Sequence, residues 1–134
     1  MHKSSLNIGL LIFRLTLGGL MLFHGYDKIV GGVDGIGGLL ASKGIPSFVA
    51  YGALIGELVA PLFIVLGYRT RLAALVMSFT MLVAFLLVHT DDFFALGKNG
   101  QWAIEVLAFF FLGGLGLFFT GGGKLALSSK NKWD

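Results

Sequence analysis

Residues 6–23 read LNIGLLIFRLTLGGLMLF, an apolar run that contains a single charged residue, Arg14. A helix needs about 20 apolar residues to cross the roughly 30 Å hydrocarbon core of a bilayer, so this run is close to spanning length. No small-residue cleavage pattern follows it, and a charge stands within it. We therefore expect a membrane helix that the chain retains, and not a cleaved signal peptide.

The rest of the chain continues this apolar composition. Of its 134 residues, 56% are hydrophobic and only 13% are charged, whereas a soluble domain usually carries about 25% charged residues. We expect four membrane helices, at about residues 6–24, 48–67, 72–89 and 101–120. The predicted fold is all-α, an antiparallel transmembrane four-helix bundle in one integral-membrane domain over residues 1–134, with no length left for a soluble catalytic domain.

The distribution of lysine and arginine predicts the orientation in the membrane. One side of the predicted bundle holds six basic residues: Lys3, Arg69, Arg71, Lys124, Lys130 and Lys132. The other side holds three: Lys28, Lys43 and Lys98. Basic residues are enriched in cytoplasmic loops, so we expect both termini in the cytoplasm.

Several classes of function are excluded by composition. The chain has no cysteine, which rules out thiolate nucleophiles, iron–sulfur clusters, thiolate zinc sites and disulfide exchange. No basic stripe with interleaved aromatic residues is present, so we expect no nucleic-acid partner. The bilayer itself is the first expected partner.

Ionisable residues within the apolar runs are the candidates for chemistry. A charge at the bilayer centre costs at least about 2.5–3.5 kcal/mol, and such residues mark functional sites by default. Arg14 and Glu57 each lie about midway along a predicted helix, so a direct pair between them is geometrically feasible. Such a pair would serve either to lock two helices together or to form part of a functional polar centre. Glu105 lies one turn inside the fourth predicted helix.

A second group of polar residues falls toward the outer ends of the predicted helices. It contains His24 and His89, and Gln101 and Trp102 open the fourth helix on the same side. We expect a cavity open to the outer leaflet, lined by Arg14, His24, Lys28, Glu57, His89 and Glu105. The two histidines could instead ligate a haem, but their spacing is not diagnostic, and we expect no metal site.

Several segments carry a resemblance to a known family. The matching segments are Arg14-Leu15 with Gly18, residues 23–29 (FHGYDKI), Gly44-Ile45-Pro46, Gly56-Glu57, residues 67–71 (GYRTR), residues 97–105 and residues 121–124 (GGGK). Together they resemble the DoxX family of small four-helix proteins of the bacterial inner membrane. The resemblance implies a multi-pass protein of the cytoplasmic membrane that is associated with quinone-linked redox chemistry or oxidative stress.

The favoured hypothesis is a quinone-linked redox or oxidative-stress membrane subunit. Glu57, Glu105 and Arg14 are its predicted catalytic residues. Its predicted cofactor-binding residues are Arg14, His24, Lys28, His89, Gln101 and Trp102. Cationic and imidazole groups would donate hydrogen bonds to the quinone carbonyls, and the two glutamates would pass protons.

Two alternatives stay open at this point. A scaffold or assembly partner would use the small-residue ridge of Gly52, Gly56 and Ala60 to bind a helix of another membrane or peripheral protein. A small oligomeric transporter would use Glu57 and Glu105, and its short chain would require a homo-oligomer.

Overall fold

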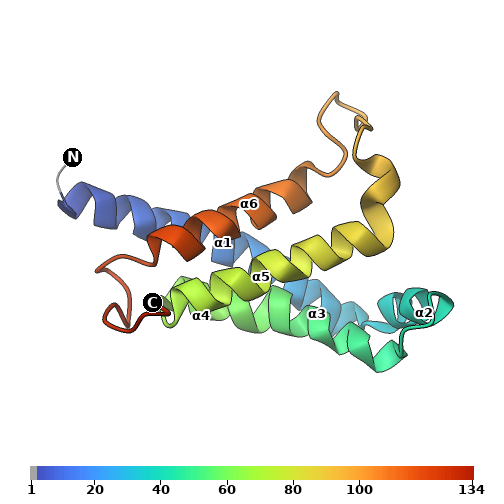
Figure 1. The fold of residues 1–134 in the computed structure, drawn as a ribbon, viewed down its shortest axis with the longest axis horizontal. Helices are drawn as coiled ribbons and strands as arrows, with labels where there is room; N and C mark the ends of the chain where they lie inside the picture. The colour runs from blue at the N-terminus through green and yellow to red at the C-terminus, as the bar shows by residue number, and fades with distance from the viewer. Residues whose placement is uncertain (1–2) are drawn as a thin grey trace.

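The computed structural model describes residues 3–134, and within them the chain is helical with no strand (Figure 1). The elements are α1 (Lys3–Gly31), α2 (Asp34–Ser42), η1 (Ser47–Tyr51), α3 (Gly52–Leu54), η2 (Ile55–Val59), α4 (Ala60–Leu66), α5 (Thr70–Ala84), η3 (Phe85–His89), η4 (Thr90–Asp92) and α6 (Glu105–Thr120). A single bridge pairs Leu96 with Trp102 in the loop before α6. The all-α prediction is confirmed for this part of the chain.

Within residues 3–134, three helical segments are long and apolar enough to cross a membrane. They are Lys3–Gly31, the run from η1 to α4 (Ser47–Leu66), and the run from α5 to η4 (Thr70–Asp92). The remaining apolar helix, α6, has 16 residues, which at about 1.5 Å per residue gives roughly 24 Å. It is therefore shorter than the predicted span over residues 101–120.

Two predicted helix boundaries differ from the structure. The first helix continues past residue 24 to Gly31 and ends where Gly32 adopts a left-handed φ of 78°. The last helix begins at Glu105, four residues after Gln101, because backbone hydrogen bonds hold the preceding loop as a narrow hairpin. In that loop Ala103 N donates to the carbonyl of Ala95. The nine-residue helix α2, which was not among the predicted helices, lies across one end of the molecule (Figure 1).

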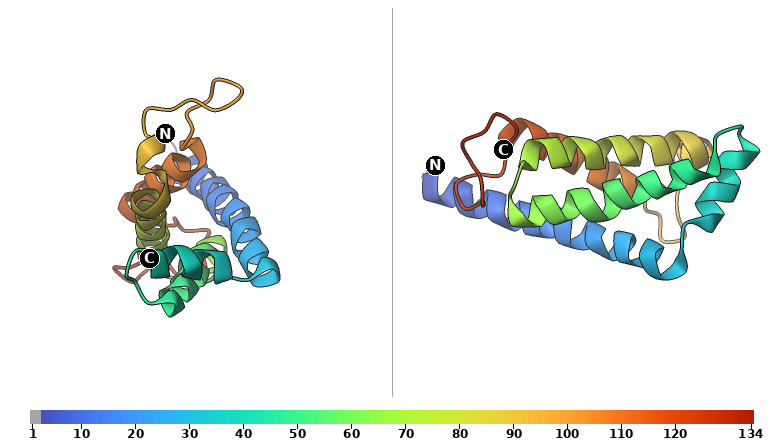
Figure 2. Two further views of the ribbon diagram at one scale, coloured as in Figure 1. Left: turned by 90° about the vertical axis from the view of Figure 1, so that its right-hand side faces the viewer. Right: turned by 90° about the horizontal axis from the view of Figure 1, so that it is seen from below.

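The long segments pack side by side, with α1 against η2 and α4, α4 against α5, and α5 against α6 (Figure 2). Glycines permit the closest approaches. A side chain at Gly25 would collide with the backbone carbonyl of Glu57, and one at Gly56 would collide with Thr80. The apolar core lies between these contacts and includes Leu17, Met21, Ile64, Met77 and Leu117.

The small-residue ridge on the second spanning segment is not free for a partner helix. Gly56 is buried against Thr80 of its own chain, and Ala60 is only 3% exposed within the core. Two of the three residues that the scaffold alternative assigned to a docking ridge, Gly56 and Ala60, are thus used in packing the chain on itself.

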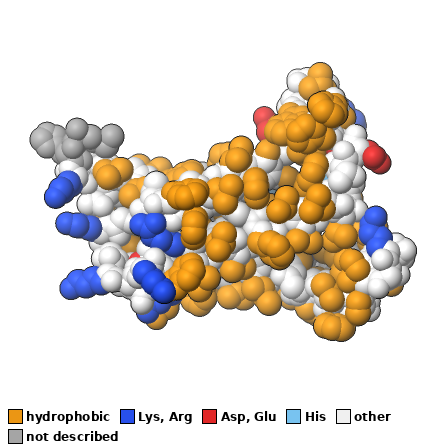
Figure 3. Space-filling view, viewed as in Figure 1, with side chains coloured by type: hydrophobic (Ala, Val, Ile, Leu, Met, Phe, Trp, Pro, Cys, Tyr) orange, Lys and Arg blue, Asp and Glu red, His pale blue; other side chains and the backbone are white. Residues whose placement is uncertain are grey.

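We call the end of the molecule that holds the turn from α4 to α5 and residues 121–134 the basic end. Lysine and arginine side chains gather there, and hydrophobic side chains cover the surface between this end and the end that carries α2 (Figure 3). Residues 121–134 fold back onto the α4–α5 turn, where Ser128 N donates to the carbonyl of Gly67. Arg71 Nη1 donates to the carbonyls of Phe118 and Phe119 at 2.9 and 2.8 Å, which neutralises the open end of α6.

Asp134 joins the folded-back residues to this turn. Its carboxyl accepts hydrogen bonds from Arg69 Nη1 at 2.9 Å, from the Ser128 hydroxyl and from the Asn131 backbone. Burial by itself raises the pKa of Asp134, but the hydrogen bonds from Ser128, Asn131 and Arg69 outweigh it and hold that pKa well below its usual range. The side chain is therefore an anion at neutral pH.

Candidate functional site

A cavity of about 420 Å³ lies at the end of the molecule that carries α2. This volume is in the range of small-molecule binding sites. Its walls come from α1, α2, the segment from η1 to η2, the segment from α5 to η3, and α6. Most lining residues are apolar, and the polar ones are His24, Lys28, Glu57, Thr80 and His89. The site is thus a largely apolar chamber with a few polar groups on its walls.

An ion pair forms part of the cavity wall. Lys28 Nζ lies 2.8 Å from Glu57 Oε1, and the two side chains are 21% and 10% exposed. Lys28 comes from the part of α1 beyond residue 24, and Glu57 comes from η2. Each charge offsets part of the free-energy cost of burying the other in a low-dielectric environment.

The backbone of η2 is widened where it presents Glu57. Pro61 has no N–H, so the carbonyl of Glu57, four residues earlier, cannot accept the usual helical hydrogen bond. The chain forms a π-type turn over Ile55–Val59 instead, in which Ala60 N donates to the carbonyl of Ile55, five residues back. Such turns occur frequently at functional sites. A second π-type turn, η3, carries His89, which also lines the cavity.

The two histidines line the cavity from different elements. The His24 ring meets Phe110 of α6 edge to face, with 5.8 Å between ring centroids. His89 Nδ1 lies 3.1 Å from Asp92 Oδ2 at the exposed rim. Over residues 3–134, no three histidine, aspartate or glutamate side chains group in a way that could hold a metal ion.

Arg14 lies away from this cavity, and the predicted Arg14–Glu57 pair is wrong. Its Nη2 donates to the carbonyl of Leu125 at 2.7 Å, and Nη1 donates to that of Val65 at 3.4 Å, both near the basic end. The prediction assumed that α1 ends near residue 24. Because α1 runs to Gly31, Lys28 reaches Glu57 instead, about 21 Å along the helix from Arg14.

Three other predicted site residues do not line the cavity. Glu105 is exposed at the first position of α6. Gln101 Oε1 accepts a hydrogen bond from Asn99 N at 3.0 Å. Trp102 Nε1 donates to the carbonyl of Phe93 at 2.6 Å, and its ring packs edge to face on that of Phe93. Gln101 and Trp102 thus brace the loop before α6.

The apolar part of the lining was not predicted from the sequence. The additional residues come from α2, α5 and α6 and include Ile36, Leu39, Leu40, Val83, Val106 and Phe110. Only α2 had a readable signal, because Val33, Ile36 and Leu40 follow helical spacing within the glycine-rich segment and pack together.

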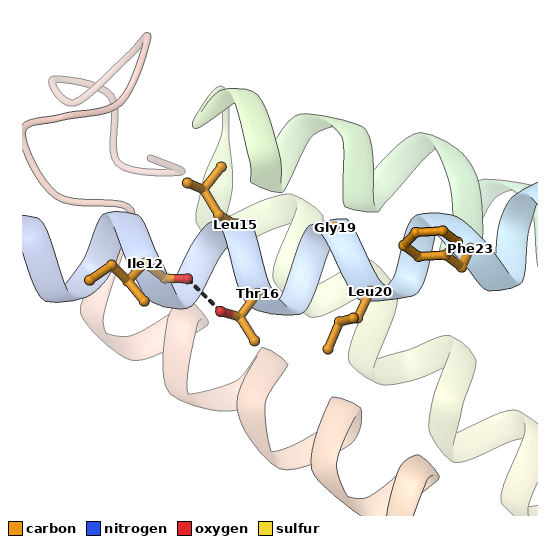
Figure 4. Close-up of a pocket in the computed structure, with 6 residues that line it drawn as sticks. All are labelled: Ile12, Leu15, Thr16, Gly19, Leu20 and Phe23. Carbon is orange, nitrogen blue, oxygen red and sulfur yellow. Dashed lines mark hydrogen bonds between the residues drawn. The ribbon is translucent and has the colours of Figure 1, made fainter.

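A second hollow is a shallow groove on the outward face of α1 (Figure 4). All its lining residues come from this one helix: Ile12, Leu15, Thr16, Gly19, Leu20 and Phe23. The Thr16 hydroxyl is its one polar side-chain group and donates to the carbonyl of Ile12 at 2.8 Å. The groove offers no charged group, so we place the candidate site in the cavity.

Comparison with known proteins identifies the family. The model of the DoxX family matches residues 9–90, which is more than half of the chain. The chain belongs to the DoxX family. The matched range includes all five polar residues of the cavity wall, whereas Gln101, Trp102 and Glu105 lie outside it. With three helices of spanning length, this DoxX-family chain is a membrane protein in contact with the lipid bilayer.

A curated relative carries a redox name. This DoxX-family chain is 31% identical over 86 residues to a protein of Bacillus subtilis (strain 168) named "Putative oxidoreductase CatD". The alignment covers 64% of the chain and 63% of that protein, so the chain spans less than two thirds of its relative's length. No solved structure matches the chain.

Proposed function

We propose that this DoxX-family chain is a quinone-binding subunit of a membrane oxidoreductase and that the cavity receives the quinone ring. The observation that carries the proposal is the Lys28–Glu57 ion pair on the wall of an otherwise apolar chamber. A quinone needs an apolar slot for its ring and hydrogen-bond donors at its carbonyls. The redox name of the Bacillus subtilis relative agrees with this chemistry.

Reduction of a quinone to a quinol consumes two electrons and two protons. Lys28 Nζ is the donor that stabilises negative charge growing on a carbonyl oxygen, and His24 is a second donor on the same helix. Glu57, bonded to Lys28, carries protons toward the ring. The chain has no cysteine, so we assign the electron supply to a redox-active partner subunit. Arg14, Glu105, Gln101 and Trp102 have no part in this site.

The proposed topology places the cavity toward the outer leaflet of a bacterial inner membrane. We infer that α6 is the fourth membrane segment and completes an antiparallel four-helix bundle. The basic end, with the α4–α5 turn and residues 121–134, holds Arg69, Arg71, Lys124, Lys130 and Lys132, whereas the loops of the other end carry Lys43 and Lys98. By the positive-inside rule the basic end faces the cytoplasm, and the first turns of α1 and residues 121–134 lie there with it (Figure 1).

Quinone binding to the purified protein in lipid nanodiscs tests the proposal. Decylubiquinone is the probe, and the variants are Glu57→Gln, Lys28→Met and the matched control Glu105→Gln. Glu105 is a carboxylate at the same end of the molecule that does not line the cavity. Loss of a charge-assisted hydrogen bond of about 1.5–3 kcal/mol predicts roughly ten- to hundredfold weaker binding in Lys28→Met. Glu57→Gln should also weaken binding, because Lys28 then loses the carboxylate that positions it. Equal affinity in all four proteins would refute the proposal.

A further inference from the structure

The cavity meets the lipid-facing surface along a seam between the second and third spanning segments. At the edge of this seam nearer the basic end, Gly56 packs directly on Thr80, so the backbones of η2 and α5 lie close together. Beyond that contact α5 packs on η2 but hardly on α3. No atom lies within 4 Å of the position that a side chain at Gly52 of α3 would take. The two segments therefore diverge beside the cavity.

The rims of this seam are apolar and belong to the cavity lining. Val49, Gly52 and Ala53 form one rim, and Phe79 and Val83 of α5 form the other. Phe79 is 65% exposed and Val49 is 44% exposed, so both rims continue onto the outer surface. A hydrocarbon chain passing between them would contact no charged side chain.

Side chains bridge two other borders of the cavity. Between α1 and α6, the His24 and Phe110 rings meet edge to face across the gap. Across the end of the molecule, Val33 and Leu40 pack on Ala50, with Leu87 of η3 against the same cluster. The seam between α3 and α5 is the border at which small residues replace such a bridge.

We propose that this seam is the subsite for the isoprenoid tail of the bound quinone and the route by which the quinone enters from the bilayer. The inference rests on the proposed function. With the ring beside the Lys28–Glu57 pair, the tail leaves the cavity between Gly52 and Val83 and lies among lipid chains. The cavity then selects quinones that carry an apolar tail, because the rims bury its first methylene groups.

Large side chains at the rims test the tail subsite. Gly52→Phe and Val83→Trp act from opposite rims, and Gly19→Phe is the matched control. Gly19 is also a helical glycine with open space around it, and it lies in the lipid-facing groove of α1 (Figure 4). The probes are decylubiquinone and the same dimethoxybenzoquinone ring without its tail. Helical circular dichroism and size-exclusion profiles confirm that each variant is folded.

The two probes separate the tail subsite from the ring site. Loss of burial of about two methylene groups predicts roughly tenfold weaker binding of decylubiquinone in both rim variants. Binding of the tail-free ring stays within about twofold of wild type, and Gly19→Phe changes neither affinity. Equal decylubiquinone affinity in wild type and both rim variants would overturn the inference while leaving the ring site in place.

A labelling experiment tests the route even if wild type binds neither quinone, a result that would defeat the proposed function. Because the chain has no cysteine, Ala84→Cys places a single thiol on the cavity wall. Pyrene maleimide dissolved in the bilayer should label it, and adding Gly52→Phe should slow labelling about tenfold whereas Gly19→Phe should not. Equal labelling rates would show that lipid-soluble molecules reach the cavity by another path.

Discussion

Breaking the Lys28–Glu57 pair from either side should destabilise the protein by about 2–3 kcal/mol. At 2.8 Å the gross attraction between unit charges is about 6 kcal/mol for an effective dielectric constant near 20. Removing one partner of a fully buried pair typically costs about 3–5 kcal/mol, because the other charge is left without a partner. Lys28 is 21% exposed, so water offsets part of this cost and the expected value lies below that range.

A double-mutant cycle with Lys28→Met and Glu57→Gln measures the interaction itself. The double variant should be more stable than the sum of the single effects predicts, with a coupling energy of about 2 kcal/mol. Unfolding in mixed detergent micelles, followed by helical circular dichroism, provides the free energies. The matched control is a cycle on His89 and Asp92, whose side chains are 40% and 46% exposed and should couple by less than about 1 kcal/mol.

Additive effects in this double-mutant cycle would refute the predicted coupling between Lys28 and Glu57. If the effects of Lys28→Met and Glu57→Gln are additive within about 0.5 kcal/mol, the two charges do not stabilise one another in the folded protein. The polar centre of the cavity would then lack the paired charges on which the proposed function depends.

Three further predictions concern packing and the basic end. Gly25→Ala should destabilise the protein by about 1–3 kcal/mol because its methyl group would collide with the Glu57 carbonyl, whereas Gly19→Ala should change unfolding by less than about 0.5 kcal/mol. Arg14→Met should cost about 2–3 kcal/mol in the same unfolding assay and leave decylubiquinone affinity unchanged, because its hydrogen bonds go to backbone carbonyls far from the cavity. Since the pKa of Asp134 is lowered in the folded state, its carboxylate stabilises the folded protein above about pH 4, and this stabilisation is lost as the pH falls through the lowered pKa. The indole NMR signal of the neighbouring Trp133 should therefore shift only in acid. Asp134→Asn should show the shifted signal already at neutral pH.

Most of the fold could be predicted from the apolar runs in the sequence. The predicted second and third helices, at residues 48–67 and 72–89, agree within a few residues with Ser47–Leu66 and Thr70–Asp92. Their length and hydropathy are local properties, so they can be read without a structure. The end of α1 and the start of α6 could not be predicted in this way, because they depend on contacts between distant residues. Gly25 and Lys28 of α1 pack against Glu57, and Ala103 N before α6 donates to the carbonyl of Ala95.

The candidate site was predicted in part. His24, Lys28, Glu57 and His89 do converge on one cavity, since similar depth in neighbouring helices brings side chains together. Their role in binding or catalysis stays a prediction. Arg14 was misplaced because its partner is the carbonyl of Leu125, and every residue carries a carbonyl. Only the folded arrangement of residues 121–134 reveals which one it binds.

The widened turn at Ile55–Val59 makes the cavity sensitive to chain length. The extra residue in this turn changes the rotation about the helix axis between the part that bears Gly52 and the part that bears Pro61. Removing one residue between Glu57 and Pro61 would rotate Glu57 by about 100° relative to Pro61. The shortened segment would still be apolar enough to cross a bilayer, yet Lys28 would face no carboxylate. Relatives could thus gain or lose this chemistry through one small insertion or deletion, while their hydropathy profiles stay nearly the same.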